Sequence, residues 1–147
     1  MNKITSVFDH SDYWFLDSFK LEGDHITVVL KEGITSKNSE NVKITGSEKI
    51  EDCYPIEITE NSKKVNIKFI KVLAHQVVDE SFAIPEEGKA DGKVLCLHHE
   101  SAYLKYLIDN SLVSQLIDDP ILHYSLSLAD DVIDIITTQH PEVNILS

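Results

Sequence analysis

The hydrophobic residues of this chain change their spacing near residue 100, and that change restricts the folds open to it. Up to residue 97, apolar side chains mostly recur at every second position, which is typical of strands that bury one face. Between residues 104 and 116, leucine and isoleucine recur at helical spacing, which indicates an amphipathic helix. Strands first and helices later predict an α+β fold rather than a doubly wound one.

The N-terminal part predicts a β-hairpin. Apolar side chains alternate within residues 13–21 and again within residues 26–30, and Glu22-Gly23-Asp24-His25 supplies the turn between them. Trp14 lies on the opposite face from Phe15 and Phe19. It is therefore either an exposed anchor or a residue buried under a further layer of the fold.

A second hairpin is expected from Tyr54–Thr59 and Val65–Val72, with its turn at residues 60–63. In its second arm the apolar face changes after Phe69, which indicates a bulge or a strand covered on both sides. The charged, glycine-containing stretch 85–92 predicts an exposed loop, and a strand is expected at Lys93–Leu97.

The first helical segment is expected to begin after Ser101, a suitable N-cap, and to end before Pro120. Asp109-Asn110-Ser111 is a potential break that divides it into two shorter helices. A strand candidate follows at Leu122–Leu126.

A last helix is expected from Ser127-Leu128-Ala129-Asp130, which resembles a capping box, through Ile136. Val143–Leu146 is expected to return to a sheet edge. We therefore predict one α+β domain spanning residues 1–147, with an antiparallel β-sheet from the N-terminal hairpins packed with C-terminal helices.

Composition excludes several partners. All 13 basic residues are lysine and the net charge is −12, so the chain lacks the arginine forks and the positive charge that grip nucleic-acid phosphates. Without an apolar leader or a membrane-length apolar run, it is expected to be cytoplasmic, with no membrane partner. Cys53 and Cys96 are expected to be free structural thiols.

His98-His99-Glu100 is the cluster that most invites a chemical role. Metal sites on helices need ligands three or four residues apart, whereas adjacent histidines point in different directions. The sequence contains no phosphate-binding loop, nucleophile elbow or calcium loop. We therefore predict no catalytic residue, metal or cofactor; a small metal- or histidine-dependent hydrolase around this cluster is the alternative.

Charge is distributed unevenly along the chain. No basic residue follows Lys105, and this stretch carries seven acids, whereas the first 105 residues carry 13 lysines and 18 acids. Helix capping accounts for Asp130 and Asp131, because acids in a first helical turn are stabilised by the helix dipole. It accounts less well for the other acids near them, Asp118, Asp119 and Asp134.

The size, the acidity and the segment His123–Asp134, expected to be a strand leading into an acid-capped helix, resemble the immunity proteins of bacterial toxin–immunity systems, such as those of contact-dependent growth inhibition. This resemblance implies a small cytoplasmic protein that neutralises a cognate toxin, frequently a basic nuclease, by covering or distorting its active site.

We accordingly expect a non-catalytic binding protein that docks an acidic surface on a basic toxin domain. A negative field speeds encounter with a basic partner and makes the affinity sensitive to salt. The residues expected to bind the partner are Asp118, Asp119, Asp130, Asp131 and Asp134.

Overall fold

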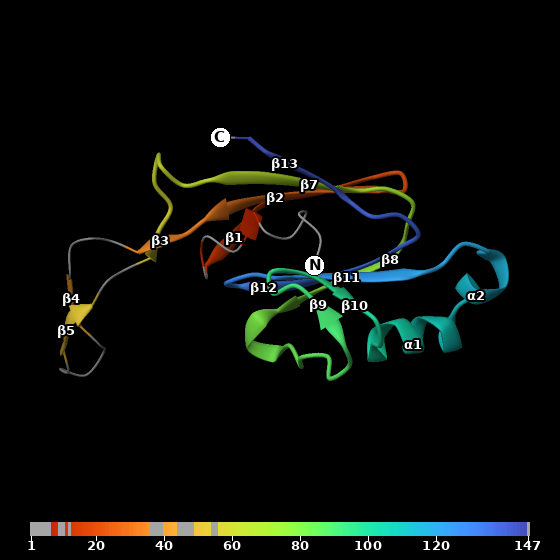
Figure 1. The fold of residues 1–147 in the computed structure, drawn as a ribbon. Coiled ribbons are helices and arrows are strands. Elements are labelled where there is room, and N and C mark those ends of the chain that lie inside the picture. Colours follow the sequence, from red (N-terminus) through yellow and green to blue (C-terminus); the bar gives the residue numbers. More distant parts are fainter. Residues whose placement is uncertain are drawn as a thin grey trace.

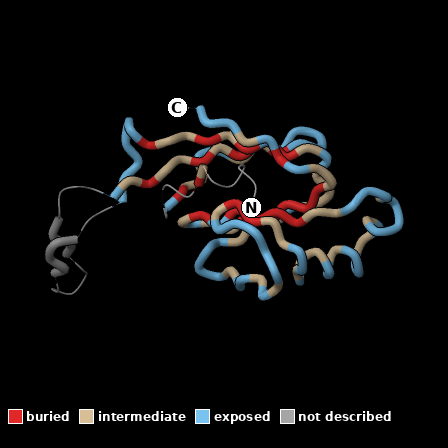
Figure 2. The backbone as a smooth tube through the Cα atoms, in the orientation of Figure 1, coloured by how far each residue is buried: buried red, intermediate tan, exposed pale blue. Residues whose placement is uncertain are grey.

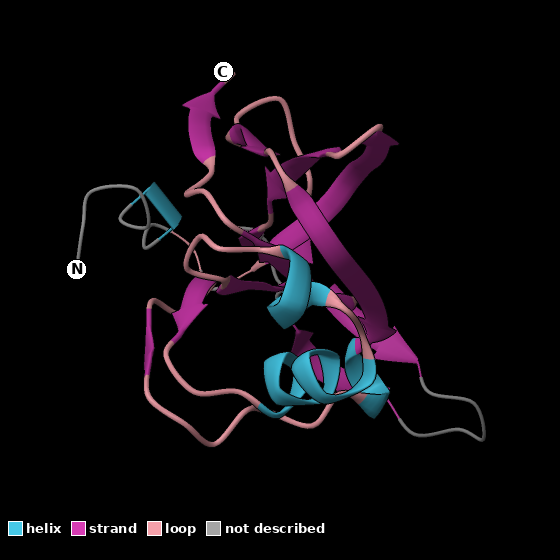
Figure 3. Cartoon of the chain, turned by 90° about the vertical axis from the view of Figure 1, so that its right-hand side faces the viewer, coloured by secondary structure: helices cyan, strands magenta, loops and turns pink. Residues whose placement is uncertain are grey.

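The computed structural model describes residues 7–8, 11, 13–35, 40–43, 49–53 and 56–146, with the backbone alone for 40–43 and 49–53. Strands predominate in the described chain, and the α-helices are short (Figure 3). In chain order the elements are β1 Trp14–Glu22, β2 His25–Glu32, β3 Ile34–Thr35, β4 Glu40–Lys43, β5 Lys49–Cys53, β6 Ile56–Glu57, β7 Lys64–Phe69, β8 Val72–Asp79, the 3₁₀ helix η2 Glu80–Phe82, β9 Ala90–Asp91, β10 Leu95–His98, α1 Ala102–Asn110, α2 Val113–Leu116, β11 Leu122–Ser127, β12 Asp131–Thr137 and β13 Glu142–Ile145.

Two antiparallel sheets lie face to face (Figure 1). The first sheet has the strand order β1-β2-β7-β13, and the second has the order β8-β12-β11-β10-β9. Two further strand pairs, β3 with β6 and β4 with β5, stand outside these sheets. The antiparallel character of the predicted sheet is confirmed, but it packs against a second antiparallel sheet, and helices contribute less to the fold than the sequence suggested.

The hydrophobic core lies between the two sheets, where Figure 2 shows the buried stretches of the chain. Every second residue of β2 and β7 faces inward and meets the inward residues of β10, β11 and β12. Trp14 is buried in this core and its Nε1 donates to the carbonyl oxygen of Phe8 at 3.1 Å. Of the two alternatives for Trp14, the structure therefore shows the buried one.

The first hairpin is confirmed, with Gly23 in a left-handed conformation in the turn between β1 and β2. The second predicted hairpin is wrong: β6 pairs with β3, whereas β7 lies between β2 and β13. The change of face after Phe69 marks the passage of the chain from one sheet to the other, since Lys71, with φ of 51°, separates β7 from β8. Tyr54 and Pro55, in the first arm of that prediction, lie outside the described residues.

The helical segment after residue 100 is confirmed. The Ser101 side chain accepts from the backbone N–H of Leu104 at 3.0 Å, and α1 ends at Asn110 before α2 begins at Val113. The strand expected at Leu122–Leu126 is β11, and the edge strand expected at the end of the chain is β13.

The prediction of a last helix is wrong, because residues 131–137 form β12 between β11 and β8. Val132, Ile133, Ile135 and Ile136 are β-branched, and such side chains suit a strand better than a helix. With a period of two, Ile133 and Ile135 enter the core while Asp134 faces the other side of the sheet. Ser127 is the last residue of β11 and residues 128–130 connect β11 to β12, so this segment is not a capping box.

The outer face of the second sheet is covered by the segment 80–92 and by α1 (Figure 1). Neither α1 nor α2 buries a side chain completely, so both are lightly docked. Within the described part of the chain, no helix has the length and apolar character needed to cross a bilayer.

Candidate functional site

Polar side chains form a row across the outer face of the second sheet. The strand register places Cys96 of β10 opposite Ser125 of β11, Ser125 opposite Asp134 of β12, and Asp134 opposite Gln76 of β8. Since residues opposite one another in neighbouring strands point to the same face, four strands each contribute one polar side chain to this row. His98 and His123 are a further opposed pair on the same face, two residues along β10 and β11 from Cys96 and Ser125.

Asp134 is the centre of a buried hydrogen-bond network. Its Oδ1 accepts from Nε2 of His123 at 2.7 Å, and its Oδ2 accepts from Nε2 of Gln76 at 2.9 Å. His123 is fully buried and Asp134 nearly so. Burial acts to raise the pKa of Asp134, but the hydrogen bonds from His123 and Gln76 outweigh it and hold that pKa below its usual value. The network therefore holds an ionised carboxylate beneath the surface.

His98 extends this network toward the open side of the sheet. Its Nε2 lies 2.7 Å from Oγ of Ser125, and its ring stacks on His123 with the ring centroids 4.5 Å apart. Burial, followed by the neighbouring His123, lowers the pKa of His98, so this ring is neutral at neutral pH. The Nδ1 atoms of both histidines are buried and have no hydrogen-bond partner among the described residues.

Glu86 ties the 80–92 segment to α1. Its two carboxylate oxygens accept from the backbone N–H groups of Ala102 at 2.7 Å and Tyr103 at 3.2 Å. At this N-terminus of α1, a negative charge also interacts favourably with the helix dipole. Tyr103 in turn packs edge-on against His123. Gly88 makes the close approach possible, because a Cβ there would lie 2.5 Å from the carbonyl oxygen of Glu100.

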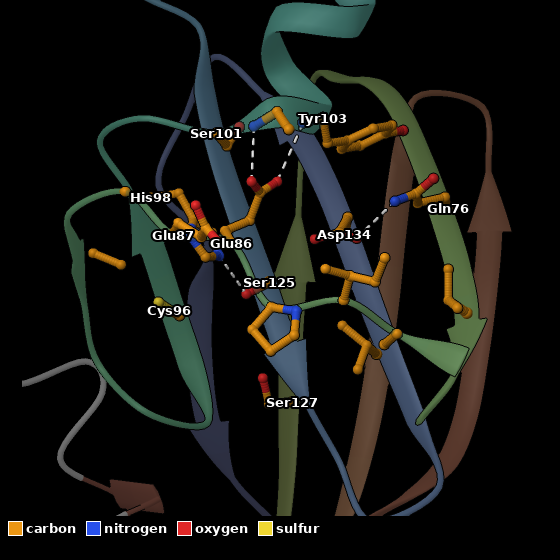
Figure 4. A pocket seen from close by; sticks show the side chains of 18 of the residues that line it. Gln76, Glu86, Glu87, Cys96, His98, Ser101, Tyr103, Ser125, Ser127 and Asp134 are labelled. Carbon is orange, nitrogen blue, oxygen red and sulfur yellow. Dashed lines mark hydrogen bonds between the residues drawn. The ribbon is translucent and has the colours of Figure 1, made fainter. Parts of the chain in front are cut away.

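Between this segment, α1 and the sheet lies a hollow of about 1180 Å³ (Figure 4). Its floor is the polar row, with Ser125 and His98 joined by their hydrogen bond. Its rim carries large apolar side chains that are strongly exposed: Phe82 is 80% exposed, Ile84 91% and Tyr106 62%. The hollow thus combines a floor of polar side chains that are hydrogen-bonded to one another with exposed apolar side chains at its rim.

The predicted cluster His98-His99-Glu100 is divided by the fold. His98 lines the hollow, whereas His99 is exposed and its Nε2 lies 2.7 Å from Oδ2 of Asp91. Glu100 lies at the exposed rim of the hollow. Within the described ranges, no three histidine, cysteine or acidic side chains gather as metal ligands.

The five predicted partner-binding acids do not form one face. Asp118 and Asp119 are exposed just before β11 begins, and Asp130 is exposed at the connection that follows β11. The six residues of β11 place these two groups about 20 Å apart. Asp131 is half-buried beside Asp130, whereas Asp134 is buried against His123 at the floor of the hollow.

Asp130 and Asp131 belong to an acidic corner next to the hollow. The backbone N–H of Glu80 donates to the carbonyl oxygen of Asp130 at 2.9 Å, and Asp131 lies opposite Asp79 in the sheet. Glu80 also lines the hollow. The acidic corner therefore consists of Asp79, Glu80, Asp130 and Asp131.

Sequence reasoning missed the residues that join the site together. Gln76, Glu86, Ser125 and the exposed Phe82 and Ile84 were not singled out, although all five line the hollow. A signal was present in β11, where His123, Ser125 and Ser127 alternate with apolar residues.

Cys96 is a free, buried thiol as expected, and burial raises its pKa. The side chain of Cys53 lies outside what the structure describes.

Comparison with protein-family models, with curated proteins and with solved structures finds no match to this chain.

Proposed function

We propose that this chain is a cytoplasmic, non-catalytic binding protein that neutralises a cognate toxin, a basic nuclease domain, by docking on it. The observation that carries the proposal is the exposed rim of the hollow, where Phe82, Ile84 and Tyr106 present large apolar side chains. Clustered exposed apolar side chains bordered by polar groups are typical of protein-binding sites, and aromatic residues dominate the energetics of such contacts.

The charges around the rim fit a basic partner. Glu80, Glu87 and Glu100 are exposed at the hollow, where the basic residues are Lys93 and Lys105. The acidic corner adds Asp79, Asp130 and Asp131 next to Glu80. Together with the net charge of −12, these acids would speed encounter with a positively charged surface and suppress neutral or acidic competitors.

The hydrogen-bonded polar floor supports a binding role. The carboxylate of Asp134 is held by two hydrogen bonds, and His98 is bonded to Ser125, so these groups fix the sheet surface beneath the hollow. A rigid floor lowers the cost of ordering the surface when a partner docks. In this arrangement the rim makes the apolar contacts, and Glu86 ties the 80–92 segment of the rim to α1.

The decisive experiment co-expresses this chain with candidate basic nuclease domains, beginning with any that are encoded beside its gene, and measures both bacterial survival and affinity. The double variant Phe82→Ser and Ile84→Ser should lose protection and bind at least about 30-fold more weakly, because it removes two exposed anchors. Leu116→Ser is the matched control, since Leu116 is 73% exposed but does not line the hollow. Full protection by the double variant would refute the proposed surface.

A histidine-dependent hydrolase is the second candidate, and one observation favours it. Nε2 of the neutral His98 lies 2.7 Å from Oγ of Ser125 at the floor of the hollow, an arrangement in which a histidine can accept a serine proton. Ser125 is only 5% exposed. Labelling by a fluorophosphonate probe that disappears in Ser125→Ala would support this candidate, and a stoichiometric transition metal in the purified protein would support the metal-dependent version.

A further inference from the structure

The edges of the two sheets differ in how they are protected from pairing with another strand. In native proteins, bulges, charged side chains or short length prevent an edge strand from pairing with a strand of another molecule. The edge strands of the first sheet are β1 and β13. β1 has a bulge between Leu16 and Ser18 and carries the ion pair of Lys20 and Glu22, and β13 is short, with four residues. At one side of the second sheet, β9 has two residues.

The other edge of the second sheet lacks these protections. β8 has eight residues, and Val72–Val78 contain no lysine, aspartate or glutamate. β8 pairs with β12 on one side, and no strand of the described chain pairs with its other side. Its register with β12 is regular from Ala74 to Asp79. This is a long, uncharged and regular edge, the kind that pairs with a further strand.

The hydrogen bonds of β8 show which residues face outward. The N–H of Glu80 donates to Asp130 of the neighbouring chain segment, and in an antiparallel ladder the residues that bond to one neighbour alternate with those that do not. Gln76 and Val78 therefore bond toward β12, whereas His75, Val77 and Asp79 direct their backbone groups to the open edge. The side chains of these three residues are also exposed, that of Val77 by 47%.

We propose that two copies of this chain pair through the open edge of β8, antiparallel and related by a two-fold axis at Val77. Val77 then lies opposite Val77 of the second copy, and His75 lies opposite Asp79, twice by symmetry. This register uses all three outward residues of each copy and forms about six backbone hydrogen bonds, two for each opposed pair. A register shifted by two residues in either direction separates His75 from Asp79.

The chemistry of the edge favours a second copy as its occupant. A two-fold interface must be self-complementary. The segment His75–Asp79 meets this requirement when two copies run antiparallel: each His75 then faces an Asp79 at the ends, and the two Val77 side chains face each other at the centre. Cross-strand pairs of this kind each stabilise a sheet. The dimer joins two five-stranded sheets into one continuous sheet and places both hollows on the same face of it.

Sedimentation velocity and light scattering of the full chain test the dimer, which should form reversibly with concentration. Val77→Lys places two like charges opposite each other at the axis and should weaken the dimer at least about 100-fold. Ile145→Lys is the matched control, because Ile145 is an apolar residue, 57% exposed, on the edge strand β13. A monomeric wild-type protein, or equal effects of the two variants, would overturn the proposal.

Disulfide trapping tests the register and does not depend on how Val77→Lys folds. Opposed residues of a hydrogen-bonded pair have Cα atoms about 5.5 Å apart, within the range of a disulfide, so Val77→Cys should form a covalent dimer under mild oxidation. His75→Cys, on the same edge, should not, because its equivalent in the second copy lies four residues further along. Cys53→Ser provides the background. Cross-linking at position 75 instead of 77 would overturn the register. Neither result depends on Phe82 or Ile84, so the dimer and the toxin-binding proposal can fail separately.

Discussion

The two faces of the second sheet are both buried, but different interactions hold them. On the inner face, Leu126 and Ile133 lie in the core between the sheets and contribute through apolar contact, which has little directionality. On the outer face, His123 and Asp134 of the same two strands are also buried and are held by directed hydrogen bonds. Adjacent positions on one strand thus belong to two different environments. Losses on the inner face should scale with volume, and losses on the outer face should depend on protonation.

The largest effect is expected from removing inner volume. Ile135→Ala should lower the free energy of unfolding by about 2–5 kcal/mol, because Ile135 is fully buried in the core and the truncation leaves a cavity. Urea denaturation at neutral pH and again at acidic pH measures it. The loss should be the same at both, and a strong pH dependence would break the distinction between the faces.

A smaller and pH-dependent effect is expected from Asp134→Asn on the outer face. The folded state holds the pKa of Asp134 below its usual value, so the ionised carboxylate stabilises the protein above about pH 4 and this contribution is lost as the pH falls through the lowered pKa. The variant should lose about 1–3 kcal/mol at neutral pH. Its difference from wild type should shrink in acid, and a constant difference would contradict the assigned role.

His98→Gln should also change the acid side of the pH profile, but closer to neutral pH than Asp134→Asn. The pKa of His98 is lowered in the folded protein by burial and by His123, so the unfolded chain binds a proton more readily and stability falls as the pH drops below about 6.5. The variant should lose less stability over this interval. Thermal unfolding at neutral and mildly acidic pH compares the two proteins; parallel curves would exclude His98 as the responsible group. Ser125→Ala keeps the histidine and serves as the control.

The smallest effect is expected at the outer layer, from Glu86→Gln. The substitution keeps the shape of the side chain but removes the charge that faces the N-terminus of α1, which should cost about 0.3–1 kcal/mol. Hydrogen exchange should quicken at the amides of Ala102 and Tyr103 and stay unchanged in β11 and β12. Faster exchange throughout both strands would show that the outer layer is not independent of the sheet.

The same comparison explains what the sequence could predict. The inner face follows from alternation, and β1, β2, α1, β11 and β13 were predicted because local patterns and caps define them. β12 was missed because two apolar pairs on either side of Asp134 fit a helical period as well as a strand covered on both sides. The strand partners of β6 and β7 are non-local, and no local pattern specifies them.

The candidate site was predicted in part for a related reason. His98 and Glu100 were singled out and both line the hollow. The acids were read as one charged segment, but only Asp130 and Asp131 reach the acidic corner, and Asp134 serves the buried network. Charge counted along the chain does not say which strand end or which face an acid occupies. That information comes only from the pairing of distant strands.

The position of β13 has a consequence for the synthesis of the protein. β7 lies between β2 and β13, and β13 consists of residues 142–145, whereas β7 ends at residue 69. While the chain emerges from the ribosome, β7 therefore keeps one unpaired edge until the residues up to β13 have also been made. The strands that cover the core from the other side, β10 to β12, also come late. Until these strands have been made, the first sheet exposes an unpaired strand edge and an apolar face, the features that make partly folded chains prone to aggregate.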